Sequence, residues 1–253
     1  MAFYKCQKSS GIKLVPWSTG SVEEIKAMVD AYYAGDLSLG DIQSVWHVGD
    51  ERSVDLAAMG SWNGSETHEA QTVQFVIMNF GGKILASDGT TEMLAIIGQK
   101  DSLKTASYMN TTNVNAEGWK NSARRSWCNN VYRSAIPQDL GSLIKPHINI
   151  TSRGSTNHTS TNTTNDYFAL PSEKEVMGSS YYSNASAEAG NNQFEYYKTQ
   201  SNRKKKTNGS YLVWWTRSPR NNNSTMFVAF NDDGATAYSL AGASKGIAPF
   251  FCI

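Results

Sequence analysis

The sequence predicts an α+β fold, on three observations. Two stretches have the 3- and 4-residue apolar spacing of amphipathic helices, the other apolar stretches are short and strand-like, and no regular strand–helix alternation is present. The 253 residues are 40% hydrophobic, which is enough to bury one large core. We therefore expect two main helices with mixed, mostly antiparallel short strands.

The first helix is expected over residues 21–34. Ser21 and Glu24 have the spacing of a capping box, and Gly35 supplies a stop. The apolar residues on one face are Ile25, Met28, Val29 and Tyr32.

A second helix is expected over residues 119–136, ended by Pro137. Its buried stripe should follow a four-residue spacing: Trp119, Ala123, Trp127 and Val131. A further capping box, Ser172 with Glu175, begins a short helix after Pro171.

Strands are expected in the apolar runs between turn signals. Gly49–Asp50, Gly81–Gly82 and the run NDDGAT (231–236) are the turns. The strand candidates are WHVGDERSVDLAAM, TVQFVIMNFGGKIL, TEMLAIIGQK, YLVWWTRS, TMFVAFN and GIAPFFCI. The polar run RGSTNHTSTNTTND (153–166) has no periodicity and is interpreted as a mobile loop.

The chain divides at about residue 45. Residues 1–45 are too few for a core of their own, so this segment either packs on the main domain or joins a partner. It is interpreted as an attachment or oligomerisation segment. Residues 46–253 form the main domain.

Charge excludes two broad classes of function. The formal net charge is +1 and the pI about 7.7, so general binding to nucleic acid or to a membrane surface is not expected. The start of the sequence has no apolar signal region and no stretch approaches 18 apolar residues, so we expect synthesis in a cytoplasm without a signal peptide and no membrane insertion. Cys6, Cys128 and Cys252 form neither a CxxC pair nor a metal-ligand spacing.

Known catalytic motifs are missing, and no metal site is expected. His68 between Glu66 and Glu69 could make a weak metal site, but a hydrogen-bonded or exposed histidine fits better. Cys128 follows Arg124 and Arg125, which could lower a thiol pKa, yet a buried helical cysteine is favoured.

Three further features have simple structural interpretations. Asp232 and Asp233 could bind a structural calcium ion, but Asn, Asp and Gly also make turns. The basic run Arg203–Lys206 is expected to be a solvated loop. Arg217, between Trp215 and Pro219, should stack on an indole and donate to carbonyls or a carboxylate as a structural staple.

Five motifs in order carry a family resemblance: WHVGD, RRSWCNNVY, FALPSEKEVMG, WWTRSP and GIAPFFCI. Together they resemble a domain of unknown function found in gut-bacterial and phage proteins. The closing motifs also resemble the C-type lectin fold of proteins diversified by retroelements and, more distantly, of the formylglycine-generating enzyme group. The resemblance covers residues 46–253 and implies a C-type lectin-like fold.

In retroelement-diversified proteins, asparagine codons between fixed blocks are the usual starting material for variation. The resemblance therefore implies an exposed, variable ligand-binding surface at Asn221, Asn222, Asn223, Met226, Ala229, Tyr238, Ser239, Leu240 and Lys245. It implies a fixed scaffold at Trp214, Trp215, Arg217, Pro219, Gly246, Pro249 and Phe250. Strand alternation puts Met226 and Ala229 on opposite faces, so one of them should be wrong unless a bulge intervenes.

The function expected from these features is non-enzymatic display. The protein would sit on a phage tail or a bacterial surface, bind a bacterial surface protein or glycan, and contact other virion proteins through residues 1–45. A homo-oligomer is compatible with this role. One alternative is an enzyme of the formylglycine-generating type, which requires a reactive thiol at Cys128 or Cys252. The other is a purely structural virion protein.

Overall fold

The computed structural model describes residues 11–60 and 67–253. The α+β class is confirmed, with small antiparallel sheets and short helices. The helices are α1 (Val22–Ala34), α2 (Leu39–Gln43), α3 (Ala123–Trp127), α4 (Arg133–Ala135), α5 (Gln138–Gly141) and α6 (Glu173–Met177). The strands are β1 (Glu51–Leu56), β2 (Gln71–Phe80), β3 (Ala95–Gln99), β4 (His147–Ser152), β5 (Thr161–Asp166), β6 (Lys205–Thr207), β7 (Ser210–Leu212), β8 (Trp214–Pro219), β9 (Met226–Phe230), β10 (Thr236–Leu240) and β11 (Phe250–Cys252).

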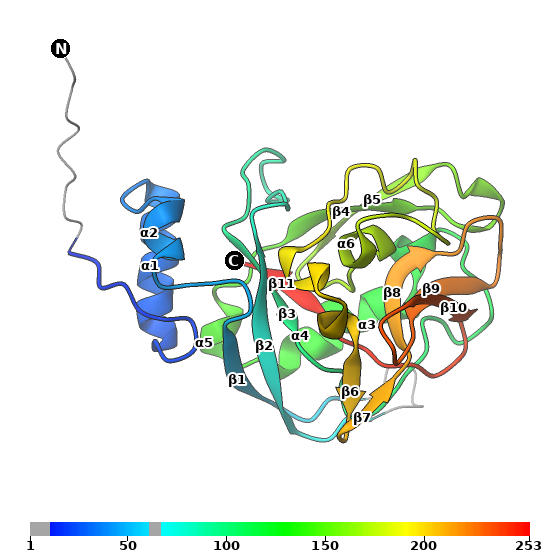
Figure 1. Ribbon diagram of the computed structural model, residues 1–253, viewed down its shortest axis with the longest axis horizontal. Coiled ribbons are helices and arrows are strands. Elements are labelled where there is room, and N and C mark those ends of the chain that lie inside the picture. Colours follow the sequence, from blue (N-terminus) through cyan, green and yellow to red (C-terminus); the bar gives the residue numbers. More distant parts are fainter. Residues whose placement is uncertain (1–10, 61–66) are drawn as a thin grey trace, which may run out of the picture.

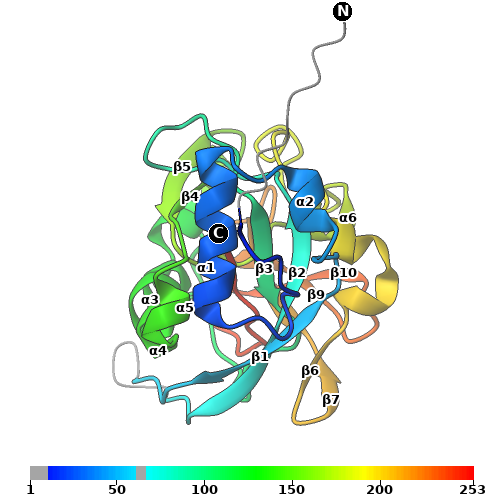
Figure 2. The ribbon, with the colours of Figure 1, turned by 90° about the vertical axis from the view of Figure 1, so that its left-hand side faces the viewer.

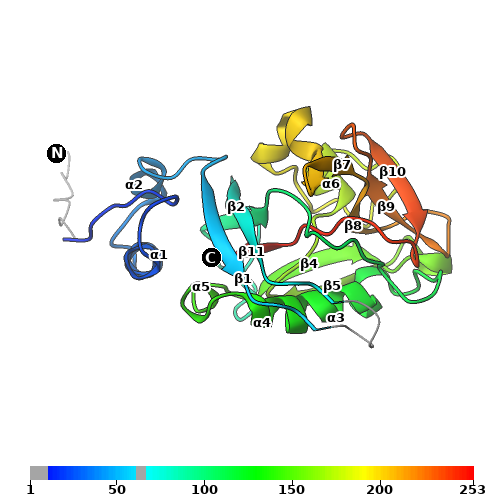
Figure 3. The ribbon, with the colours of Figure 1, turned by 90° about the horizontal axis from the view of Figure 1, so that it is seen from below.

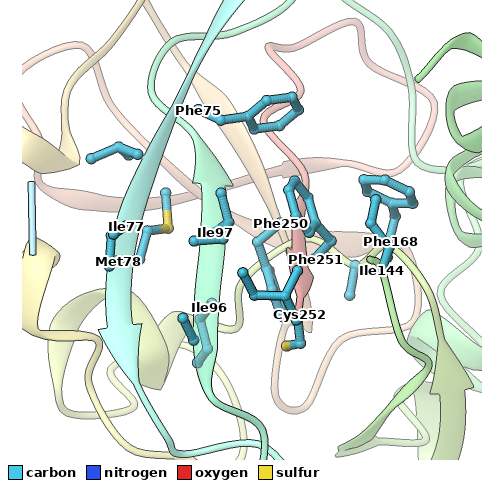
Figure 4. Close-up of a cluster of buried hydrophobic side chains, with 14 of the residues drawn as sticks. Phe75, Ile77, Met78, Ile96, Ile97, Ile144, Phe168, Phe250, Phe251 and Cys252 are labelled. Atoms are coloured by element: carbon cyan, nitrogen blue, oxygen red, sulfur yellow. The ribbon is translucent and has the colours of Figure 1, made fainter. Parts of the chain in front are cut away.

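A four-stranded antiparallel sheet, in the order β1-β2-β3-β11, forms the centre of the molecule. Every residue of β3 is buried. Figure 4 shows apolar side chains of β2, β3 and β11 meeting those of Phe168 and Ile144. The last strand of the chain is therefore part of the core, because β11 pairs with β3.

The second sheet, in the order β10-β9-β8, lies at the opposite end of the molecule from α1 and α2 (Figures 1 and 3). Hairpins β4–β5 and β6–β7 complete the strands. The predicted turn at 231–236 joins β9 to β10, where Gly234 has φ +83°. The Gly81–Gly82 turn begins a longer loop, because β2 pairs with β3 at residues 95–99 and not with the residues that directly follow the turn.

The N-terminal segment packs on the main domain, and α1 lies across the sheet end in Figure 2. The capping box of Ser21 with Glu24 and the stop at Gly35 are both present. Trp46 Nε1 donates to the Val15 carbonyl at 2.8 Å, and the Tyr33 hydroxyl donates to the Ile253 carbonyl at 3.1 Å. The described residues of this segment, 11–45, therefore pack on the main domain. None of the helices formed by described residues is long and apolar enough to cross a membrane.

The second predicted helix is interrupted. A 3₁₀ turn (Gly118–Asn121) holds Trp119, and a π-helical turn (Cys128–Tyr132) separates α3 from α4. The π turn shifts the spacing, so Tyr132 is buried and Val131 only partly so. The predicted stripe is therefore wrong at Val131 and at Ala123, which is also only partly buried.

The run 153–166 is not simply a loop, because its second half is β5. Residues 161–166 alternate exposed and buried, and they pair with β4 from His147↔Asp166 to Ser152↔Thr161. The buried positions are the polar residues Asn162, Thr164 and Asp166. A strand whose inward side is polar escapes a search for apolar periodicity.

Candidate functional site

The candidate site is the surface around the β9–β10 hairpin. We call it the hairpin face and define it by Arg220, residues 221–224, Met226, Tyr238 and Leu240. Tyr238 pairs with Val228 and Leu240 with Met226, so these side chains lie on one face of the sheet. Tyr238 and Leu240 are each 41% exposed, which is high for large apolar side chains.

Tyr238 is held in place from two sides. The Arg220 guanidinium lies 3.7 Å from the centre of its ring, and the Tyr182 ring meets it edge-on at 4.9 Å. Arg220 N also donates to the Met226 carbonyl at 3.0 Å, which ties the start of the asparagine loop to β9. The result is an accessible aromatic ring that its neighbours hold in place. Rigid aromatic side chains of this kind are common in recognition surfaces.

The asparagine run has a fixed backbone and accessible side chains. Asn221 N donates to the Tyr182 carbonyl at 2.7 Å, and the Asn223 side chain accepts from Thr225 N at 2.9 Å. Asn115 Nδ2 donates to the carbonyls of Asn223 and Met226. Asn222 is exposed and has φ +54°, a conformation that asparagine tolerates better than most residues.

A hollow of about 310 Å³ adjoins this loop. Its lining residues are Ser155, Thr156, His158, Asn222, Asn223 and Ser224. Hydroxyls, amides and one imidazole line it, with no carboxylate or ammonium among them. Such a lining can exchange hydrogen bonds with an uncharged polar ligand.

The structure separates the predicted display positions into three groups. Asn222, Tyr238 and Leu240 are exposed, while the others, except Ala229, are partly buried: Asn221, Asn223, Met226, Ser239 and Lys245. Ala229 is completely buried, so the expectation that it lies at the surface is wrong. It lies in the middle strand β9 between Trp215 of β8 and Ala237 of β10, and its side chain belongs to the buried apolar core. The predicted conflict between Met226 and Ala229 is resolved in favour of Met226.

All of the predicted scaffold positions are buried: Trp214, Trp215, Arg217, Pro219, Gly246, Pro249 and Phe250. Trp215 Nε1 donates to the Ser107 carbonyl and Trp214 Nε1 to the Arg203 carbonyl, each at 2.8 Å. The polar atoms of both indoles are thus paired, and the hairpin face rests on a buried, hydrogen-bonded layer.

Arg217 is the polar centre of this layer. Its guanidinium makes two hydrogen bonds to the Glu175 carboxylate, one of them at 2.7 Å, and a third to the Leu170 carbonyl at 2.8 Å. Lys83 also contacts Glu175 and donates to Asn149 at 3.0 Å. The predicted bonds of Arg217 to a carbonyl and a carboxylate are present, and the cation that lies over the Trp214 ring is Lys205.

Opposite charges set the ionisation of this cluster. Burial alone would raise the pKa of Glu175, but the positive charges of Arg217 and Lys83 outweigh burial and hold the pKa at about 2. Glu175 therefore remains a carboxylate through the physiological range, where it is the shared partner of Arg217 and Lys83.

Two more buried carboxyls hold the loop that carries Tyr182. Glu173 accepts from Tyr182 N at 3.1 Å, from Ser183 N at 2.7 Å and from the Thr236 hydroxyl at 2.7 Å. Glu188 accepts from the Ser183 hydroxyl at 3.2 Å. This loop connects the buried charges to the hairpin face, because Tyr182 packs on Tyr238.

Glu188→Gln is expected to change how stability depends on pH. Burial raises the pKa of Glu188 to about 7, and hydrogen bonding by Ser218 and the charge of Arg217 only partly offset burial. A raised carboxyl pKa means that the folded state binds the proton more tightly, so stability falls as pH rises from about 4.5 to about 7. The free energy of unfolding falls by about 1.4 kcal/mol for each pH unit between the unfolded and the folded pKa values.

Urea unfolding of both proteins between pH 4.5 and 8 checks this expectation. The glutamine variant should gain stability relative to the wild type as pH rises through this range. A constant difference between the two proteins would contradict it.

Two of the three cysteines lie in the interior of the described structure. Cys128 and Cys252 are both fully buried. Burial raises the pKa of Cys252 well above its usual value, so its thiolate is disfavoured. Cys252 lies in the apolar cluster of Figure 4. Cys6 lies outside the described residues.

The remaining sequence candidates have structural surroundings. His68 is buried against the Trp127 ring, 5.1 Å between centroids, and Glu66 lies outside the described residues. Asp233 accepts from Ala235 N at 2.8 Å within the hairpin turn. Over residues 11–60 and 67–253, no group of three His, Cys, Asp or Glu residues is placed to hold a metal ion.

The basic run 203–206 differs from the expected solvated loop. Lys205 is fully buried in β6, where its ammonium donates to the carbonyls of Gln99 and Lys100 and lies over the Trp214 ring. Burial lowers the pKa of Lys205 to about 7. The strand alternation of β6 accounts for the difference, since it turns the middle lysine inward.

Sequence reasoning missed most of the buried polar cluster. Lys83, Asp166 and Glu188 were not singled out, and Glu175 was noted only as a helix cap. One signal in the sequence could have found this cluster. Acidic and amide residues lie inside apolar or strand-forming segments, and polar residues in such segments are usually buried and paired.

Comparison with known protein families gives one match. A family model described as "Domain of unknown function (DUF6273)" matches residues 93–253. No curated protein and no solved structure matches the chain. The matched region includes β3 to β11, and with them the whole hairpin face and most of the buried charge cluster. Because the match spans more than half of the 253 residues, this chain belongs to the DUF6273 family.

Proposed function

We propose that this protein is a non-enzymatic binding protein whose hairpin face recognises a ligand outside the cell. The observation that carries the proposal is the accessible Tyr238, clamped by Arg220 and Tyr182 beside an asparagine loop with a fixed backbone. Aromatic rings supply contact area at low entropic cost, and Asn and Ser supply adaptable hydrogen bonds.

The same arrangement favours a surface whose side chains can change without loss of the fold. Asn222, Tyr238 and Leu240 project outward, while the residues beneath them are buried and internally paired. This division supports our proposal of a C-type lectin-like fold diversified by a retroelement, as in the family resemblance. The ligand is then a bacterial surface protein or glycan, and the protein part of a phage tail or a bacterial surface.

The two alternatives receive less support. An enzyme of the formylglycine-generating type needs a reactive thiol, whereas Cys128 and Cys252 are buried. A purely structural virion protein would not require an accessible, clamped aromatic beside a hollow.

Tyr238→Ala is expected to weaken ligand binding by about 30-fold, the loss typical of a central aromatic contact. Purified, labelled protein is titrated onto intact cells of the bacterium that the phage infects or that carries the gene. Tyr211→Ala is the matched control, because Tyr211 is 50% exposed but lies on β7, away from the hairpin face.

Three results would count against the proposal. Equal losses in the two variants would place binding elsewhere than on the hairpin face. Wild-type protein that neither binds cells nor competes with phage adsorption would favour the structural role. A thiol that reacts rapidly in the native protein would favour the alternative of an enzyme of the formylglycine-generating type.

A further inference from the structure

Glu188 is the most weakly bonded of three buried glutamates in residues 173–188. Glu173, Glu175 and Glu188 are all fully buried. Glu173 accepts from two main-chain N–H groups and a hydroxyl, and Glu175 is paired with two cations. Glu188 Oε2 accepts from the Ser183 hydroxyl at 3.2 Å, and in the part of the chain that the structure describes its Oε1 has no hydrogen-bond partner. A buried oxygen without a donor favours the protonated, uncharged acid.

The charged groups around Glu188 come from two elements, β8 and α6. Burial, the largest cause, raises the pKa of Glu188 to about 7. A hydrogen bond from Ser218 and the positive charge of Arg217, both on β8, act against this rise. The negative charges of Glu173 and Glu175 on α6 add to it. The ionised form is therefore attracted by β8 and repelled by α6.

Arg217 offers the ionised form of Glu188 a new partner. Arg217 Nε is buried and, like Glu188 Oε1, has no hydrogen-bond partner among the described residues. The two atoms are an acceptor and a donor that carry opposite charges once Glu188 is ionised. A hydrogen bond between them would be charge-assisted and therefore stronger than the bond that Glu188 now accepts from a hydroxyl.

Ser183 is the residue that a movement of Glu188 would release. Its hydroxyl donates to Glu188, and its N–H donates to Glu173 at 2.7 Å. One residue thus bridges the two carboxyl groups, so the position of residue 183 depends on both of them.

Both chain neighbours of Ser183 touch the hairpin face. The Tyr182 carbonyl accepts from Asn221 N at 2.7 Å, and Asn184 Nδ2 donates to Asn221 Oδ1 at 3.3 Å. The Tyr182 ring meets the Tyr238 ring edge-on at 4.9 Å. A shift of Ser183 would therefore disturb the aromatic clamp and the start of the asparagine loop together.

We infer that the proton on Glu188 regulates the hairpin face through Ser183. With the proton bound, Glu188 stays with Ser183 and Tyr182 holds Tyr238. When the proton is lost, the carboxylate turns toward Arg217, Ser183 is released and the clamp on Tyr238 loosens. The effect on ligand binding rests on the proposed function, whereas the movement of the loop does not.

The sign follows from the form that closes the clamp. Because the protonated form is the competent one, affinity should be high in weak acid and fall as pH rises through about 7. About nine-tenths of Glu188 is protonated one pH unit below its pKa and about one-tenth one unit above it. Apparent affinity scales with the competent fraction, so binding should be up to about tenfold weaker at pH 8 than at pH 6.

The amide resonances of Tyr182 and Ser183 test the loop movement without any ligand. In isotope-labelled wild type, both should shift with pH, with a midpoint near 7. Glu188→Gln keeps the shape of the side chain but cannot ionise, so it should remove this titration. Glu195→Gln is the matched control and should keep it, because Glu195 is exposed and pairs with Lys198.

Binding to intact cells at pH 6 and pH 8 tests the effect on recognition. Wild type and Glu195→Gln should lose about tenfold between the two conditions, and Glu188→Gln should lose much less. His158 and Lys205 are present in all three proteins, so their titration does not contribute to the difference. Melting temperatures at both pH values establish that each protein is folded.

Three results would overturn the inference. The first is wild-type amide resonances of Tyr182 and Ser183 that do not titrate near pH 7. The second is the same titration in Glu188→Gln, and the third is an equal pH dependence of cell binding in wild type and Glu188→Gln. Titrating resonances in a protein that binds cells at neither pH would reject the proposed function and leave the control of the loop by Glu188 in place.

Discussion

Replacing Glu175 by glutamine is expected to lower the free energy of unfolding by about 3–5 kcal/mol, the usual cost of breaking a buried ion pair from one side. Arg217 and Lys83 are both buried and share this carboxylate. Glutamine keeps the size of the side chain but removes the negative charge that both cations contact. Chemical denaturation at pH 7 measures the loss.

Glu24→Gln provides the matched control. Glu24 occupies the same capping-box position in α1 as Glu175 does in α6, and it pairs with Lys13 at the surface. Exposed pairs of this kind contribute less than about 1 kcal/mol. Similar losses in the two variants would mean that helix capping, and not the buried charge, explains the role of Glu175.

The Glu175 carboxylate also makes the free energy of unfolding depend on pH. Its pKa is held at about 2 in the folded protein against a usual value of 4.5. A lowered carboxyl pKa contributes stability that is present above the unfolded value and is lost as pH falls through the folded value. The advantage of the wild type over Glu175→Gln should therefore shrink between about pH 5 and pH 2.

Local signals in the sequence predicted much of the frame. The capping boxes at Ser21 and Ser172 and the turn at 231–236 depend on residues within a few positions of one another, and all three are present. Such features need no knowledge of distant segments. The residues around Trp215 that the family resemblance implied as scaffold are buried.

Partners far apart in the sequence could not be predicted. Arg217 meets Glu175 across 42 positions and Lys83 meets Glu175 across 92, distances over which pattern reasoning has no reach. The burial of Ala229 has a similar cause, since it depends on which distant core residues pack on its face of β9. Strand alternation in the sequence predicted that Met226 and Ala229 lie on opposite faces. It could not show which of the two faces is buried.

The hairpin face illustrates the same limit. Asparagine at 221–223 indicated an accessible loop, and Asn222 is exposed. The clamp on Tyr238 comes from Arg220 and Tyr182, which belong to different segments and meet only after folding. Tyr182 lies in a polar stretch that sequence periodicity could not place.

Asp166→Asn is expected to destabilise the protein by about 3 kcal/mol or more, because a carboxylate with several donors is replaced by an amide that must present a donor to some of them. Asp166 is fully buried at the end of β5. Its carboxylate accepts from Trp119 Nε1 at 2.9 Å, from Asn149 at 3.0 Å and from Arg125 Nε at 2.6 Å.

These donors come from the 3₁₀ turn before α3, from β4 and from α3, so one side chain joins three separate segments. Asp55→Asn is the control, since Asp55 also lies in a strand but is exposed and accepts from Thr72 across the sheet. Its loss should stay near 0.5 kcal/mol, as for most surface substitutions. If Asp166→Asn unfolds at the same denaturant concentration as the wild type, residues 161–166 are not the fixed strand described above. The polar run would then behave as the loop that its composition predicted.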